Sequence, residues 1–297
     1  GYDVYVFEAL HEIGGVLKYG IPEFRLPNAI VDVEIENLRK MGVHFQTDVI
    51  VGKTISVDDL EKAGFKGIFV GSGAGLPNFM NIPGENLINI MSSNEYLTRV
   101  NLMDAANPKT DTPMNLGKNV LVVGGGNTAM DSCRTAKRLG ANVTLAYRRS
   151  DAELPARAEE VKHAKEEGIN FMTLHNPVEY LADEKGAVKQ AILAVMKLGE
   201  PDESGRRSPI DTGERVTIDC DQVVVAVGVS PNPLVPKSIA GLELGRKNTI
   251  AVGDDMQSSR KLLYAGGDIV RGGATVILAM GDGRRAAANM HAQLSAK

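Results

Sequence analysis

Cysteine is scarce in this sequence. Only Cys133 and Cys220 occur among the 297 residues, and they form no CxxC pair. This scarcity excludes a disulfide framework, a cysteine-rich zinc site and a dithiol redox motif. We therefore expect a reducing, cytoplasmic setting for the protein.

Long apolar runs and an excess of one charge are also missing. The longest apolar runs, such as 223–229, fall far short of the roughly 18 residues that a membrane span needs, and no signal peptide is evident. The 33 Lys and Arg against 37 Asp and Glu give a net charge of −4. Nucleic-acid binders need clustered basic residues. We therefore expect neither a membrane nor a nucleic acid as a partner.

Catalytic and metal-binding constellations do not stand out. The five histidines show no ligand spacing, and we find no Ser/His/Asp or Cys/His arrangement. We therefore expect no metal site and no catalytic side chain, which is consistent with chemistry carried by bound cofactors.

Glycine, by contrast, is abundant and grouped. It supplies 32 of the 297 residues, above the usual share of about 7%. The length of the chain suggests two domains. One group follows a predicted strand at 118–123 with the spacing Gly124-x-Gly126-x-x-Ala129. A helix that ends at Gly140 and a second strand at 142–147 come next.

A strand, a glycine loop, a helix and a second strand together predict a dinucleotide-binding unit. Glycine permits the tight turn and the approach of backbone N–H groups to a diphosphate, and the helix N-terminus adds partial positive charge. The alternative is that these glycines serve packing only. The candidate contacts in this unit are Gly124, Gly125, Gly126, Asn127, Thr128 and Ala129.

The end of the second strand predicts which dinucleotide binds. A site that prefers NADH would carry an acid there, but the sequence has Arg148 and Arg149, with Arg157 nearby. Guanidinium groups bind a phosphate dianion well, so we expect NADPH rather than NADH. The alternative is that these arginines are solvated surface charges.

Two further segments flank this unit. Residues 1–8 read as a buried parallel strand ending in Glu8, an acid in the position that binds ribose hydroxyls. Near the other end, a strand closes on Gly267-Asp268, and a helix start at 272–280 would offer free N–H groups at Ala274, Thr275 and Val276. Asp268 could bind the hydroxyls of a flavin side chain. The alternatives are an ordinary strand end and a turn aspartate.

Several segments together resemble one family, the small (beta) subunit of NADPH-dependent glutamate synthase. Related subunits occur in ferredoxin:NADP transhydrogenase and sulfide dehydrogenase. The matching segments span almost the whole chain and are 14–27, 124–131, 147–149, 154–157, 265–268 and 274–281.

The resemblance implies an α/β fold with two Rossmann-like domains of the glutathione-reductase type, the NADPH domain being inserted into the FAD domain. The implied domains are 1–78 (FAD, first part), 79–232 (NADPH) and 233–297 (FAD, return segment). The implied FAD contacts include Glu8, Gly15, Gly267, Asp268 and Thr275, and Arg148, Arg149 and Arg157 would flank the 2′-phosphate. Val51 and Gly228 complete the candidate cofactor contacts.

The family is expected to begin with a cysteine-rich iron–sulfur domain and the first glycine loop for FAD, which this sequence lacks. We therefore interpret it as an N-terminally truncated member with an incomplete FAD domain. The implied function is to pass electrons from NADPH through FAD to iron–sulfur clusters and a large glutamate synthase subunit, or another iron–sulfur partner. The resemblance also allows a homodimer. The alternatives are a nucleotide-binding or docking fragment without turnover, and a transhydrogenase or sulfide dehydrogenase subunit.

Overall fold

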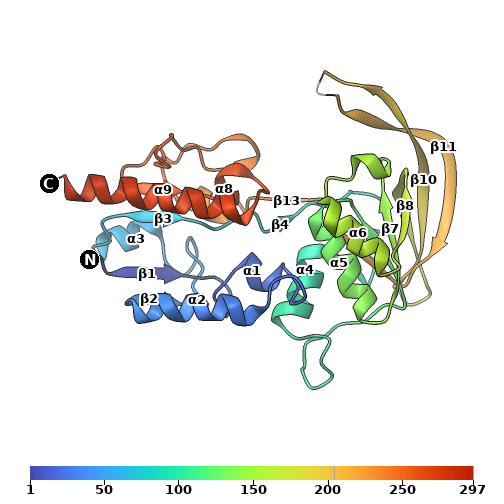
Figure 1. Ribbon diagram of the computed structural model, residues 1–297, viewed down its shortest axis with the longest axis horizontal. Coiled ribbons are helices and arrows are strands. Elements are labelled where there is room, and N and C mark those ends of the chain that lie inside the picture. The colour runs from blue at the N-terminus through green and yellow to red at the C-terminus, as the bar shows by residue number, and fades with distance from the viewer. Residues whose placement is uncertain (204, 297) are drawn as a thin grey trace. The chain divides into compact units, whose positions relative to one another are not determined.

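The computed structural model describes residues 1–203 and 205–296 (Figure 1). The chain divides into two compact units. Unit 1 comprises Gly1–Ile13, Ile35–Leu76 and Val229–Lys297, and unit 2 comprises Gly14–Glu34 and Pro77–Gly228. Within the described residues, no helix combines the length and the apolar character needed to span a bilayer.

A five-stranded parallel sheet forms the centre of unit 2. Alternate residues of one strand face opposite sides of a sheet, and here both sides are apolar. Val120 and Val122 pack on one face, while Leu121 and Val123 pack on the other. In spatial order the strands are β5 (Ile90–Ser92), β12 (Gln222–Val225), β6 (Asn119–Val123), β7 (Asn142–Tyr147) and β8 (Asn170–Thr173).

Helices cover one face of this sheet, and a second sheet covers the other. The helical layer contains α4 (Ser93–Leu97), which continues as the π-helix η1 (Thr98–Leu102), then α5 (Asn127–Arg138) and α6 (Ala158–Glu166); η2 (Asp151–Glu153) is a short 3-10 turn. The second sheet is antiparallel, in the order β11 (Arg207–Asp219), β10 (Val188–Pro201), β9 (His175–Ala182). These three strands follow one another along the chain as an antiparallel meander.

The segment 14–34 is part of unit 2, whereas the sequence analysis placed it in the first domain. It contains α1 (Val16–Tyr19) and the first half of α2 (Asn28–Lys40). Asn101 donates a hydrogen bond to the Tyr19 carbonyl, and Arg25 forms ion pairs with α5 and α6. The chain therefore changes unit four times. The predicted crossings at 78/79 and 232/233 lie close to two of these changes, near β4 (Leu76–Pro77) and β13 (Val229–Ser230).

Unit 1 contains two separate pairs of parallel strands. β1 (Val4–Phe7) pairs with β2 (Val43–Gln46), and β3 (Ile68–Val70) pairs with β14 (Leu263–Ala265). A buried apolar cluster that includes Val57, Val70, Leu263 and Ile269 forms its core. The other elements of the unit are α3 (Val57–Lys62), α7 (Leu234–Ser238), η3 (Arg246–Asn248), α8 (Asp268–Arg271) and α9 (Val276–Ser295).

The first strand is not buried, although the sequence predicted that it would be. Val4 is 42% exposed and Tyr5 is 38% exposed. Among the described strands β1 pairs only with β2, so one of its edges has no strand beside it. Leu38 of α2 and Met41, which follows α2, are exposed as well.

Candidate functional site

The loop between β6 and α5 requires glycine at two positions for reasons internal to the protein. Gly124 has a φ of +137°, and a Cβ there would lie 2.3 Å from the Ala226 carbonyl oxygen. A Cβ on Gly125 would lie 2.7 Å from the Tyr147 ring. Larger residues would therefore move the loop away from β7 and β12.

Gly126 is different, because nothing in the protein requires it to be glycine. Its φ of −85° suits any residue, and a Cβ there would meet no atom within 4 Å. Among the described residues, no acceptor is paired with the backbone N–H groups of Gly126, Asn127 and Thr128. Free N–H groups at a helix start, next to open space, fit a diphosphate.

The structure separates the three candidate arginines. Arg148, directly after β7, is exposed, and so is Arg157 at the start of α6. Arg149 is only 8% exposed, and its Nε donates a hydrogen bond to the Arg207 carbonyl at 2.9 Å. Arg148 and Arg157 are therefore the exposed guanidinium groups that could meet a 2′-phosphate.

The start of α6 is attached to the glycine loop. The Arg157 N–H donates to Asn127 Oδ1 at 2.9 Å, and the Ala156 N–H donates to the Gly125 carbonyl at 3.1 Å. These bonds place Arg157 beside the free N–H groups of α5, so the loop and one candidate arginine form a single site.

A second site region in unit 1 surrounds Gly267 and Asp268. The buried Asp282 carboxylate of α9 accepts a hydrogen bond from the Gly267 N–H and pairs with Arg271 at 2.6 Å. Hydrogen bonds from Arg271 hold the pKa of Asp282 below its ordinary value. Asp282 thereby fixes the turn that carries Asp268.

One prediction for this turn was wrong. The Ala274 N–H is not free, because it donates to Asp268 Oδ1 at 3.0 Å. The N–H groups of Thr275 and Val276, at the start of α9, have no acceptor among the described residues. Burial raises the pKa of Asp268, and its second oxygen could accept a hydrogen bond from a sugar hydroxyl. These groups fit a flavin side chain.

The remaining candidates are distributed over both units. Glu8, after β1, accepts a hydrogen bond from the Leu10 N–H, and its carbonyl accepts one from Val49. Val51, close by, packs against the core of unit 1. Gly15 (φ +53°) and Gly228 (φ +106°) belong to unit 2.

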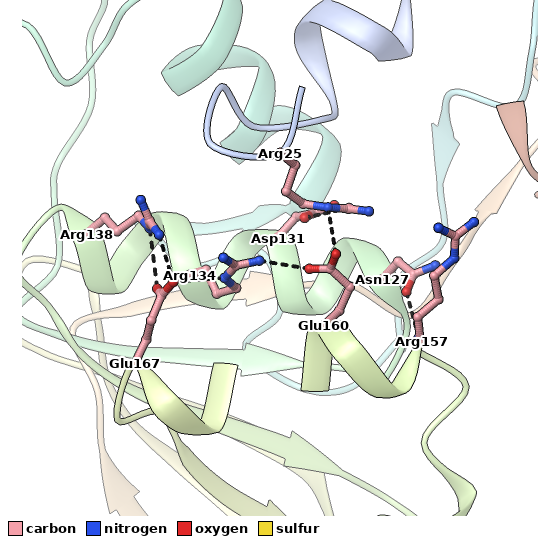
Figure 2. A network of polar contacts seen from close by, with 8 residues as sticks. All are labelled: Arg25, Asn127, Asp131, Arg134, Arg138, Arg157, Glu160 and Glu167. Atoms are coloured by element: carbon pink, nitrogen blue, oxygen red, sulfur yellow. Dashed lines mark hydrogen bonds and ion pairs between the residues drawn. The ribbon is translucent and has the colours of Figure 1, made fainter. Parts of the chain in front are cut away.

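The sequence analysis missed a network of ion pairs that joins α5, the α6 region and the segment around Arg25 (Figure 2). Arg25 Nη1 lies 2.8 Å from both carboxylate oxygens of Asp131, and its Nε lies 3.1 Å from Glu160. Arg134 joins Glu160 to Glu167, and Arg138 also pairs with Glu167. Burial raises the pKa of Asp131 to about 6, although Arg25 lowers it. The sequence offered one signal, the carboxylate of Asp131 directly after the apolar Ala129 and Met130.

Comparison with known proteins gives one family. Residues 9–283 match the family model described as pyridine nucleotide-disulphide oxidoreductase. The beta subunit of an NADP(+)-dependent formate dehydrogenase from Moorella thermoacetica is 39% identical, over 98% of this chain and 40% of its own. The glutamate synthase [NADPH] small chain of Azospirillum brasilense is 35% identical, over 100% of this chain and 63% of its own.

Among solved structures, the chain is similar to FprA from Mycobacterium tuberculosis. The TM-score is 0.80 at 20% identity, over 98% of this chain and 78% of FprA. At this identity the likeness shows the fold alone, and it confirms the predicted α/β class with a parallel sheet. The chain spans about half the length of the curated relatives it matches.

Proposed function

Because the chain belongs to the pyridine nucleotide-disulphide oxidoreductase family, we propose that it oxidises NADPH and reduces FAD within a larger enzyme of the glutamate synthase small-chain type. The observation that carries this proposal is the glycine loop. Its free N–H groups face open space, with Arg157 attached alongside.

The residues of unit 2 would bind and select the nucleotide. The N–H groups of Gly126, Asn127 and Thr128 would hold the diphosphate, with support from the dipole of α5. Arg148 and Arg157 would bind the 2′-phosphate, which NADH lacks. Arg149 would have a structural role, because its hydrogen bond to the Arg207 carbonyl connects the end of β7 to β11.

The residues of unit 1 would orient the flavin. Asp268 would accept hydrogen bonds from its sugar-alcohol hydroxyls, and the Thr275 and Val276 N–H groups would stabilise negative charge at the start of α9. The two bound cofactors supply the hydride transfer itself, so no side chain need act as an acid or base.

We further propose that the electrons leave toward iron–sulfur clusters and a partner subunit. Support comes from the relatives, whose names describe a subunit of a formate dehydrogenase and the small chain of a glutamate synthase. Glutamate synthesis is the proposed end use. A subunit of a ferredoxin:NADP transhydrogenase or of a sulfide dehydrogenase remains the alternative, because the proposed cofactor sites alone do not distinguish these enzymes.

The test of nucleotide selection compares NADPH and NADH titrations of the wild-type chain and Arg148→Ala. Loss of charge-assisted hydrogen bonds should weaken NADPH binding by about 10- to 100-fold and leave NADH nearly unchanged. Arg215→Ala, which removes an exposed pair with Asp211, is the matched control. Equal affinity of the wild type for both nucleotides would refute the proposal.

Turnover is tested separately from binding. After incubation with FAD and removal of unbound flavin, the purified chain should retain flavin absorbance and reduce a dye when NADPH is supplied. A colourless protein that binds NADPH but reduces nothing would instead be a nucleotide-binding module without turnover.

A further inference from the structure

Arg25 lies between two carboxylates that would otherwise repel each other. Asp131 is on α5, and Glu160 is on α6. The side chains of Asp131 and Glu160 are only 6% and 13% exposed, so water screens them poorly. The Arg25 guanidinium, itself 20% exposed, contacts both. Arg25 therefore joins the two helices that begin at the nucleotide site.

The hydrogen bond from the Arg157 N–H to Asn127 joins the same two helices at their starts. Asp131 is four residues beyond Asn127, or about 6 Å along α5 at the usual helical rise. Glu160 is three residues beyond Arg157 on α6. Figure 2 shows both contacts, with Asn127 and Arg157 at one end and Arg25 above Asp131 and Glu160. The contact at the helix starts leaves α6 free to pivot, and the ion pairs of Arg25 and Arg134 with Glu160 fix its direction.

Further contacts hold the loop that carries Arg25. Phe24 lies beneath the guanidinium groups of Arg134 and Arg138, at 4.6 and 4.1 Å from its ring centre. Arg134 also contacts Glu160 at 2.8 Å. The loop between α1 and α2 is thus attached to α5 by an aromatic ring and an ion pair.

We propose that Arg25 is a positioning residue for nucleotide selection: it fixes α6 against α5 so that Arg157 faces the 2′-phosphate while the glycine loop holds the diphosphate. This inference rests on the proposed function, and it adds a residue that makes no contact with the nucleotide.

The test uses the full chain with Arg25→Gln, which removes the ion-pair partner of Asp131 and leaves Glu160 with Arg134 alone. The affinities for NADPH and NADH are measured by titration. The ratio of the two affinities should fall by about tenfold, which is within the effect that an ångström of misplacement can have. General damage to the fold would weaken both nucleotides alike and leave the ratio unchanged.

Two further variants sharpen the test. The double variant Arg25→Gln, Asp131→Asn removes the repulsion between Asp131 and Glu160. It should restore part of the preference for NADPH over NADH. Arg25→Lys keeps the charge without the planar fork, and should lower the ratio less than Arg25→Gln; it takes the place of Arg25→Gln if that variant does not fold. Arg215→Gln, in an exposed pair of the same unit, should leave the ratio unchanged.

The outcomes separate this inference from the function on which it rests. If the wild type prefers NADPH and a folded Arg25 variant keeps the full ratio, the positioning role is refuted and the proposed function stands. If the wild type does not prefer NADPH, both fail. A lower ratio that the double variant partly restores supports the positioning role.

Discussion

Two neighbouring glycines in the loop between β6 and α5 differ in what requires the absence of a side chain. Gly125 lies against the Tyr147 ring, whereas Gly126 faces open space. Both could be located from the sequence, because the spacing of a glycine loop is a local signal. Which glycine serves the fold and which serves the ligand depends on Tyr147, 22 positions further on, and the sequence does not reveal that.

This difference predicts opposite effects of two alanine substitutions. Gly126→Ala should leave the thermal unfolding temperature nearly unchanged but weaken NADPH binding by about tenfold or more, because its methyl group occupies the diphosphate position. Gly125→Ala should lower the free energy of unfolding by about 1–3 kcal/mol through overpacking. Calorimetry and nucleotide titration of both variants provide the check. Equal destabilisation by the two substitutions would contradict this account.

Burial of Asp268 predicts a pH dependence in the cofactor-free protein. Its pKa is raised in the folded state, so its contribution to stability is present below the ordinary pKa of 3.8 and is lost as pH rises through the raised value. Asp268→Asn should therefore be at least as stable as the wild type at neutral pH, while it binds FAD more weakly. Urea unfolding at several pH values and flavin titration measure the two effects. A less stable variant at neutral pH would contradict the prediction.

Among the elements, the turn at 267–271 depends on α9. Asp282 is 1% exposed and accepts hydrogen bonds from Gly267 and Arg271. The sequence predicted the Gly-Asp turn and the following helix, but not Asp282, which is one acid among many. Its role depends on which face of α9 meets the turn.

Removal of this carboxylate should be costly. Asp282→Asn should lower the free energy of unfolding by about 3 kcal/mol, since it leaves Arg271 and Gly267 with weakened partners. The pKa of Asp282 is lowered in the folded state, so its stabilisation is present above the ordinary value and is lost as pH falls through the folded one. Asp211→Asn, in an exposed pair, should change stability by less than about 1 kcal/mol. Chemical denaturation compares them, and similar losses in both would refute the role of Asp282.

For the whole molecule, the predicted family and fold class are confirmed, and the oxidoreductase activity with FAD and NADPH belongs to the proposed function. The predicted site residues and the electron acceptor stay predictions. The glycine loop, β6, α5 and β7 could be predicted because their signals are contiguous. The placement of 14–34 could not, because Arg25 and its partner Asp131 are 106 positions apart. The exposure of β1 was also missed, since an apolar strand does not specify how many neighbours it has.

Two units with separate cores predict two unfolding transitions. NADPH at 100 times its dissociation constant should stabilise unit 2 by about 2.7 kcal/mol, because the nucleotide binds only the folded form. Scanning calorimetry should show one transition move while the other stays. A single transition that moves as a whole would show that the two units unfold together.

Because residues 14–34 belong to unit 2, the boundaries of that unit matter for protein engineering. A nucleotide biosensor cut from the chain at 77 and 228 would contain the whole parallel sheet and the glycine loop, yet it would lack Arg25 and Phe24. Asp131 would then lose its ion-pair partner, and Glu160 would keep only Arg134. A usable sensor would have to graft the excised loop back through a linker.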